Sequence, residues 1–195
     1  MRLLVVVVSI AALALPLHAA TCGPTPATGC HAGAPGTGLL ILLNYPNPTR
    51  DELTWRWNRG DQTTLAELGD PLTSTSYAFC LYDASAGPQP LSNLAVPAGG
   101  FCSRKPCWKK LRNGFKYQSR LYTPDGVFGL RLKAAGPGAA TVRLGAAGPV
   151  FVMPPIPFTP PVVVQLLNTE NGACWQATYS NFLENEDYRI KARND

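Results

Sequence analysis

Apolar and polar residues alternate along several short stretches of this chain, with the period of two that is typical of half-buried β-strands. The clearest stretch is 53–58, where large apolar residues occupy every second position: Leu53, Thr54, Trp55, Arg56, Trp57, Asn58. Residues 162–167 are instead strongly apolar, with Gln165 as the one polar residue, as expected for a strand that is buried on both faces. Gly- and Pro-rich turns separate these stretches.

The alternation predicts nine or ten short strands, at 39–44, 53–58, 75–82, 91–96, 115–122, 127–133, 140–144, 162–167, 174–179 and 188–192. No window of ten or more residues holds a helical period, and only 65–68, 109–112 and 181–186 could each form a helical turn. Many short strands punctuated by turns favour an all-β fold. We expect an antiparallel two-sheet β-sandwich, Ig-like or related and stapled by disulfides, in preference to a barrel.

The first 20 residues have the pattern of a secretory signal peptide. Arg2 is followed by an apolar run over 3–15 and then by small residues before position 21. A run of ~13 apolar residues is short for a membrane span, and no later run approaches 18. An alternative is a lipoprotein in which Cys22 is acylated. We therefore predict a secreted, periplasmic or cell-surface protein without a transmembrane segment after processing: 1–20 signal peptide, 21–38 Gly/Pro-rich leader outside the core, 39–195 one β-sandwich domain.

All six cysteines lie after the predicted signal peptide. In an exported protein an even number predicts three disulfides, for which about 15 connectivities exist. The short separations favour pairing Cys22 with Cys30 and Cys102 with Cys107, which leaves Cys80 for Cys174. A metal site is not expected, because there is no second close cysteine pair like 102/107 and only one histidine after the predicted signal peptide.

Positive charge is concentrated in one part of the chain. The formal net charge is only +5, but no acidic residue occurs between Asp83 and Asp125. The cations in this interval that we predict to form a basic binding patch are Arg104, Lys105, Lys109, Lys110, Arg112 and Lys116, with Arg120 close behind. Such a patch attracts anions with salt-dependent strength, whereas a solvated strand edge is the structural alternative. An anionic polysaccharide or an envelope surface fits better than nucleic acid, since no nucleic-acid module is present.

Catalytic motifs are absent from the sequence. His31 is the one histidine after the predicted signal peptide and lies in the Gly/Pro-rich leader, and no nucleophile elbow, zinc-protease or nucleotide-binding motif occurs. Asp70, Asp83 and Asp125 are more simply turn residues than paired catalytic acids. Trp55 and Trp57 could form an aromatic platform for sugar rings, although inward-facing aromatic residues of a sandwich are usually core. We expect no cofactor.

A set of short motifs resembles an uncharacterised family of secreted bacterial β-domains. The resemblance covers about residues 51–180 and includes Trp55-x-Trp57-x-x-Gly60, Tyr77-x-x-Cys80-Leu81-Tyr82-Asp83, Lys105-Pro106-Cys107-Trp108 and Cys174-Trp175-x-Ala177. No activity is assigned to that family. The resemblance therefore implies an exported β-domain and transfers no functional residue.

Together these features favour an exported, non-catalytic binding or structural surface module that contacts an anionic polysaccharide or the cell envelope. The alternative is a secreted carboxylate-dependent hydrolase acting on glycans, which needs two acids about 5–10 Å apart in a cleft.

Overall fold

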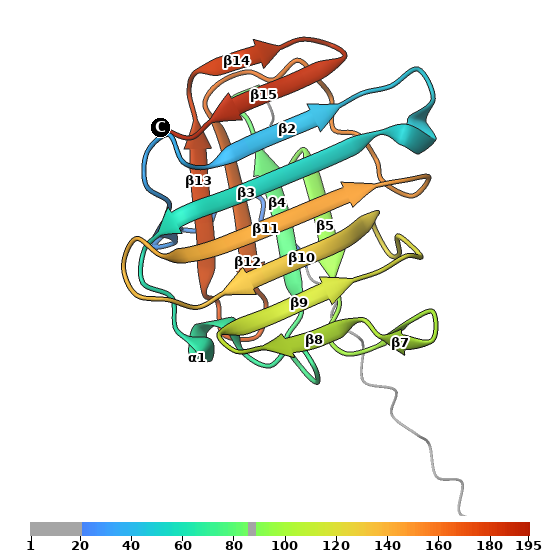
Figure 1. Cartoon of the computed structure of the whole chain (residues 1–195). Coiled ribbons are helices and arrows are strands. Elements are labelled where there is room, and N and C mark those ends of the chain that lie inside the picture. Colours follow the sequence, from blue (N-terminus) through green and yellow to red (C-terminus); the bar gives the residue numbers. More distant parts are fainter. Residues whose placement is uncertain (1–20, 86–88) are drawn as a thin grey trace, which may run out of the picture.

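The chain folds into two antiparallel β-sheets packed face to face. A computed structural model describes residues 21–85 and 89–195, so the predicted signal peptide lies outside the described residues (Figure 1). One sheet has five strands in the order β1 (His31–Ala32), β13 (Cys174–Tyr179), β12 (Val162–Asn168), β4 (Tyr77–Tyr82), β5 (Ser92–Val96). The other has eight, in the order β14 (Phe182–Asn185), β15 (Arg189–Arg193), β2 (Leu39–Leu43), β3 (Glu52–Gly60), β11 (Ala140–Ala147), β10 (Val127–Lys133), β9 (Gly114–Gln118), β8 (Trp108–Leu111).

Short elements connect these sheets. The hairpin of β6 (Phe101–Cys102) and β7 (Lys105–Pro106) precedes β8, a 3₁₀ turn η1 (Pro48–Arg50) precedes β3, and the only α-helix of the described residues is α1 (Leu65–Leu68). Thr64 caps α1 and exchanges hydrogen bonds with Glu67, which is a capping box. The proline-rich stretch 149–161 forms no strand and carries the chain from β11 to β12, as expected for residues that cannot donate to a ladder.

The core lies between the sheets and consists of the inward-facing alternate residues of both. In Figure 1 the strands of the five-stranded sheet run steeply across those of the eight-stranded sheet, which is the crossed type of sheet packing. Trp55 of β3 meets Phe79 of β4 across this interface, with ring centroids 5.7 Å apart. The predicted all-β, two-sheet architecture is confirmed. Two predicted helical turns are wrong, because 109–112 and 181–186 pair as the edge strands β8 and β14.

The disulfides differ from two of the three predicted pairs. Cys102–Cys107 is confirmed, but Cys22 is bonded to Cys80 and Cys30 to Cys174. Sequence proximity favoured the wrong pairs because it ignores sheet topology: Cys80 and Cys174 lie on β4 and β13, with β12 between them. The bond to Cys80 also leaves no thiol on Cys22 for a lipid, so the acylation alternative is wrong in this structure.

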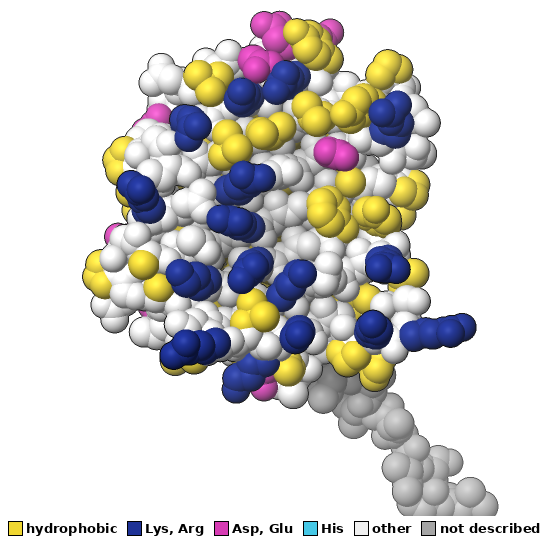
Figure 2. Space-filling view, in the orientation of Figure 1, with side chains coloured by type: hydrophobic (Ala, Val, Ile, Leu, Met, Phe, Trp, Pro, Cys, Tyr) yellow, Lys and Arg dark blue, Asp and Glu magenta, His cyan; other side chains and the backbone are white. Residues whose placement is uncertain are grey.

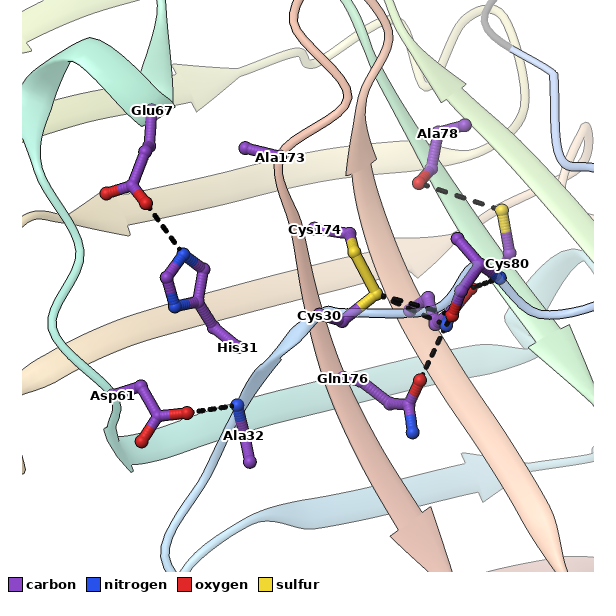
Figure 3. Close-up of a disulfide and its surroundings, with 12 residues drawn as sticks. Cys30, His31, Ala32, Asp61, Glu67, Ala78, Cys80, Ala173, Cys174 and Gln176 are labelled. Atoms are coloured by element: carbon purple, nitrogen blue, oxygen red, sulfur yellow. Dashed lines mark hydrogen bonds and ion pairs between the residues drawn. A yellow bond between two sulfur atoms is a disulfide. The ribbon is translucent and has the colours of Figure 1, made fainter.

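Residues 21–32 are not a free tether, since they cross the outer face of the five-stranded sheet. The segment is bonded at Cys22 to β4, hydrogen-bonded at Ala27 to the fully buried Gln165 of β12, and bonded at Cys30 to β13. It then adds β1 as a parallel strand beside β13. Figure 3 shows the Cys30–Cys174 bond close to Gln176. The Gln176 side chain accepts a hydrogen bond from Gln165. The segment is therefore docked on the sheet, although its residues remain outside the buried core.

Candidate functional site

A row of cations crosses the outer face of the eight-stranded sheet. Cross-strand pairing places Lys109 opposite Lys116, Lys116 opposite Arg131, Arg131 opposite Arg143, and Arg143 opposite Arg56. The members of this cationic row come from five adjacent strands and are Lys109 (β8), Lys116 (β9), Arg131 (β10), Arg143 (β11) and Arg56 (β3). Neighbouring strands lie ~4.7–4.9 Å apart, so the row is a ladder of positive charge at that spacing.

No acidic side chain among the described residues forms an ion pair with the row. Within residues 21–85 and 89–195 the ion pairs are His31–Glu67 and Arg189–Glu184, and neither involves a member of the row. Figure 2 shows Lys and Arg side chains spread over this face, while Asp and Glu side chains form a cluster only at its upper edge and are otherwise scattered. Like charges placed directly opposite each other on a sheet cost roughly 0.2–1 kcal/mol per pair. An anion bound across the strands would remove that cost.

A shallow hollow lies beside the row, where two glycines face each other. Gly129 of β10 pairs with Gly145 of β11, and the space above them has a volume of about 300 Å³. A Cβ on Gly145 would meet the ring of Phe128 at 2.5 Å, so that ring lies over Gly145. A Cβ on Gly129 would meet no atom closer than 4.0 Å. This glycine hollow is lined by Arg56, Lys116, Arg131 and Arg143.

The structure divides the basic patch predicted from the sequence. Lys109 and Lys116 lie side by side in the cationic row. Lys110 is exposed but belongs to the opposite side of β8, since it pairs with the inward-facing Phe115, and Arg112 is in the β8–β9 turn. Arg104 and Lys105 lie in the β6–β7 hairpin and line a second hollow, which also contains Arg120.

Three members of the row were not predicted. Arg56, Arg131 and Arg143 are far apart in sequence, and each stands between apolar residues that face the core. The sequence signal that could have found them is a single outward-facing cation in each of three strands whose apolar and polar residues alternate. It was insufficient because the register of β3, β11 and β10 places them in one row, and sequence alternation does not determine register.

The aromatic platform proposed as an alternative is wrong, because Trp55 and Trp57 are fully buried. The Trp55 indole donates to the Tyr179 hydroxyl at 3.0 Å, and the Trp57 indole donates to the Gln176 carbonyl at 2.9 Å. A Cβ on Gly60 would overlap the Trp57 ring, so this ring packs over a position that admits only glycine. Both tryptophans are structural.

The acidic residues considered for catalysis act in loops. The Asp70 carboxylate accepts from the Leu72 amide, and the Asp125 carboxylate accepts from the Ala95 amide. Asp83 accepts from the Thr159 amide at 2.8 Å. The Asp70 contact is that of a turn residue, whereas Asp83 and Asp125 join segments that are distant in sequence. In the described part of the chain no group of three or more His, Cys, Asp or Glu side chains is placed to hold a metal ion.

His31 and Glu67 form an ion pair beside a third hollow. His31 Nε2 lies 2.9 Å from Glu67 Oε1 (Figure 3). The His31 ring also stacks on Trp175. Burial alone would raise the pKa of Glu67, but hydrogen bonds from Thr64 and His31 outweigh burial and hold that pKa below its usual value. No nucleophile lines this hollow, and the pair joins the N-terminal segment to α1.

No helix of the described residues is long and apolar enough to cross a membrane. The three disulfides are typical of a protein in an oxidising compartment. Neither protein-family models, nor curated proteins, nor solved structures yield a match to this chain. The resemblance to secreted bacterial β-domains thus stays a prediction, and the functional argument depends on the geometry alone.

Proposed function

We propose that this protein is an exported, non-catalytic module that binds an anionic polysaccharide across the outer face of its eight-stranded sheet. The observation that carries the proposal is the cationic row: five cations from five adjacent strands, in register and without an acidic partner among the described residues. A linear polyanion laid across the strands can meet every member of the row.

A polysaccharide suits this surface for two further reasons. The glycine hollow lowers the surface beside the row and gives a sugar ring room to approach the guanidinium groups of Arg131 and Arg143. Guanidinium groups form paired hydrogen bonds with carboxylate, phosphate or sulfate groups. In the oxidising compartment that the disulfides indicate, acidic glycans are polymers that carry such groups at regular spacing.

The alternative function, a carboxylate-dependent hydrolase, is less well supported, because Trp55 and Trp57 are buried and cannot flank a cleft. The carboxylates of Asp70, Asp83 and Asp125 each accept a hydrogen bond from a backbone amide. Binding without catalysis therefore accounts for more of the observed surface.

Retention on immobilised polygalacturonate tests the proposal. We expect R56Q/R131Q/R143Q to bind about tenfold more weakly than the unmodified protein, because each exposed ion pair contributes ~0.2–1 kcal/mol. Retention should also fall steeply with salt. The matched control R50Q/K110Q/R112Q removes the same charge at exposed positions outside the row. If the control loses as much retention as the row variant, only net charge matters and the proposed site is wrong.

A further inference from the structure

A second, more enclosed hollow lies at the corner of the same face. This corner pocket has a volume of about 450 Å³ and is built from the β6–β7 hairpin, the loop after β9 and the start of β10. Its charged side chains are Arg104, Lys105 and Arg120, and no acid lines it. A volume of this size lies within the ~300–1,000 Å³ typical of small-ligand sites.

The corner pocket has aromatic as well as cationic walls. Tyr122 and Phe128 line it with their rings edge to face and centroids 6.2 Å apart. Both rings are partly exposed, unlike the buried aromatic residues of the core. Gly148 makes room for the Tyr122 ring, since a Cβ there would lie 3.2 Å from it. Aromatic faces beside cations suit a ligand that has both an apolar ring face and an anionic group.

Backbone strain is concentrated around this pocket. Among the described non-glycine residues, positive φ occurs at Arg59, Ser103 and Tyr122, and the last two line the corner pocket, with φ of 69° and 58°. Such a conformation is unfavourable for a residue with a side chain and is typical of ligand sites, where surrounding structure enforces it. Here the Cys102–Cys107 bond closes the hairpin that carries Ser103.

The corner pocket continues into the glycine hollow. Gln118 and Phe128 line both spaces, so a chain that follows the cationic row can place one unit in the pocket. No hydrogen bond or ion pair of the described residues engages the side chains of Arg104, Lys105 or Arg120. Their charges are free to meet an anionic group.

We propose that the corner pocket binds a single acidic sugar unit of the polysaccharide. The sugar ring lies against Tyr122 and Phe128, and its anionic group lies among Arg104, Lys105 and Arg120. This inference rests on the proposed function, and it assigns the two sites different tasks. The cationic row supplies salt-dependent affinity for any polyanion, whereas the pocket selects which acidic sugar is bound.

Calorimetric titration with monosaccharides separates the two proposals. Galacturonate and glucose 6-phosphate are the probes and glucose is the neutral reference. We expect at least one acidic sugar to bind about tenfold more tightly than glucose. Preference for galacturonate assigns a carboxylate to the pocket, and preference for glucose 6-phosphate assigns a phosphate.

The variants R104Q/R120Q and Y122N should each lower affinity for the preferred acidic monosaccharide about tenfold, and R56Q/R131Q/R143Q should lower it less than about twofold. Asn is chosen at position 122 because it tolerates a positive φ. Unchanged monosaccharide affinity in both pocket variants, or equal binding of all three sugars, would overturn the pocket. Loss of polymer retention in the row variant alone would leave the proposed function standing without the pocket.

Discussion

The outer faces of the two sheets differ in what covers them. On the five-stranded sheet, residues 21–32 cover β4, β12 and β13 and are joined to them by two disulfides and by hydrogen bonds to Gln165. On the eight-stranded sheet, the row from Lys109 to Arg56 is bare, and its like charges lie opposite one another. One face is closed by the chain itself and the other is left open.

The difference indicates that the covered face contributes to stability and that the open face contributes to binding. Covering a face satisfies its polar groups and adds apolar contact, and both stabilise the fold. Five unpaired cations on the open face destabilise the fold instead. The fold tolerates this loss because the covered face and the core provide the stability. The predictions below test this division, beginning with the change of largest expected effect.

Removing the disulfides that close the covered face should destabilise the protein most. On the chain-entropy model, the loops closed by Cys30–Cys174, Cys22–Cys80 and Cys102–Cys107 correspond to about 5, 4 and 2 kcal/mol. Their sequence separations are 144, 58 and 5 residues. We therefore expect urea unfolding to give the order C30S/C174S, then C22S/C80S, then C102S/C107S, from least to most stable.

The third disulfide variant is also a functional control. Cys102–Cys107 holds the hairpin of the corner pocket, so C102S/C107S should lose acidic monosaccharide binding at a small cost in stability. If this variant were the least stable of the three, the covered face would not be the main source of stability.

The strands could be predicted from the sequence because alternation reports directly on burial. The stretch 53–58 became β3, with Trp55 and Trp57 inward and Arg56 outward, as its period of two required. The edge strands β8 and β14 were harder, since an exposed edge does not need a regular apolar face. Residues 109–112 are largely polar and resembled a helical turn for that reason.

Long-range features could not be predicted in the same way. The pairing of Cys22 with Cys80 depends on which strand lies beneath the N-terminal segment, and the cationic row depends on the register of five strands. A shift of one residue in β10 would turn Arg131 inward and Leu132 outward. The sequence contains the pattern of each strand, but the site arises from how the strands are aligned.

Acid should weaken the junction between the covered face and α1. The pKa of Glu67 is lowered in the folded state from a usual value near 4.5, so the folded protein favours the carboxylate. Stability from this group is present above that usual value and is lost as pH falls through the lowered folded pKa. We expect E67Q to be less stable than the unmodified protein at neutral pH, and the difference in stability to shrink as pH falls below 4.5.

Urea midpoints across this pH range provide the measurement. The Gln side chain keeps much of the shape of Glu and can still complete a capping box with Thr64, so the variant isolates the charge. A difference between the two proteins that stays constant down to about pH 3 would contradict the assignment.

The smallest expected effect is the change in stability when a cation of the row is removed. Whether stability rises or falls is the sharpest test of the comparison between the two faces. Arg131 lies between Lys116 and Arg143, so R131Q removes two like-charge contacts from the open face. We expect the variant to be more stable by about 0.5 kcal/mol at low salt, because such pairs are destabilising. The gain should shrink in high salt, which screens exposed charges. Polygalacturonate retention should fall in the same variant.

K110Q is the matched control on β8, since Lys110 is an exposed cation that lies outside the row. Its stability and its retention should both stay close to those of the unmodified protein. If a cation serves only to keep a strand edge solvated, its removal should lower the stability of the protein or leave it unchanged. If a cation serves to bind a ligand, its removal should raise the stability of the protein and lower its affinity for the ligand. If R131Q were destabilising, or if it were stabilising without loss of retention, the open face would not be a binding surface maintained at the expense of stability.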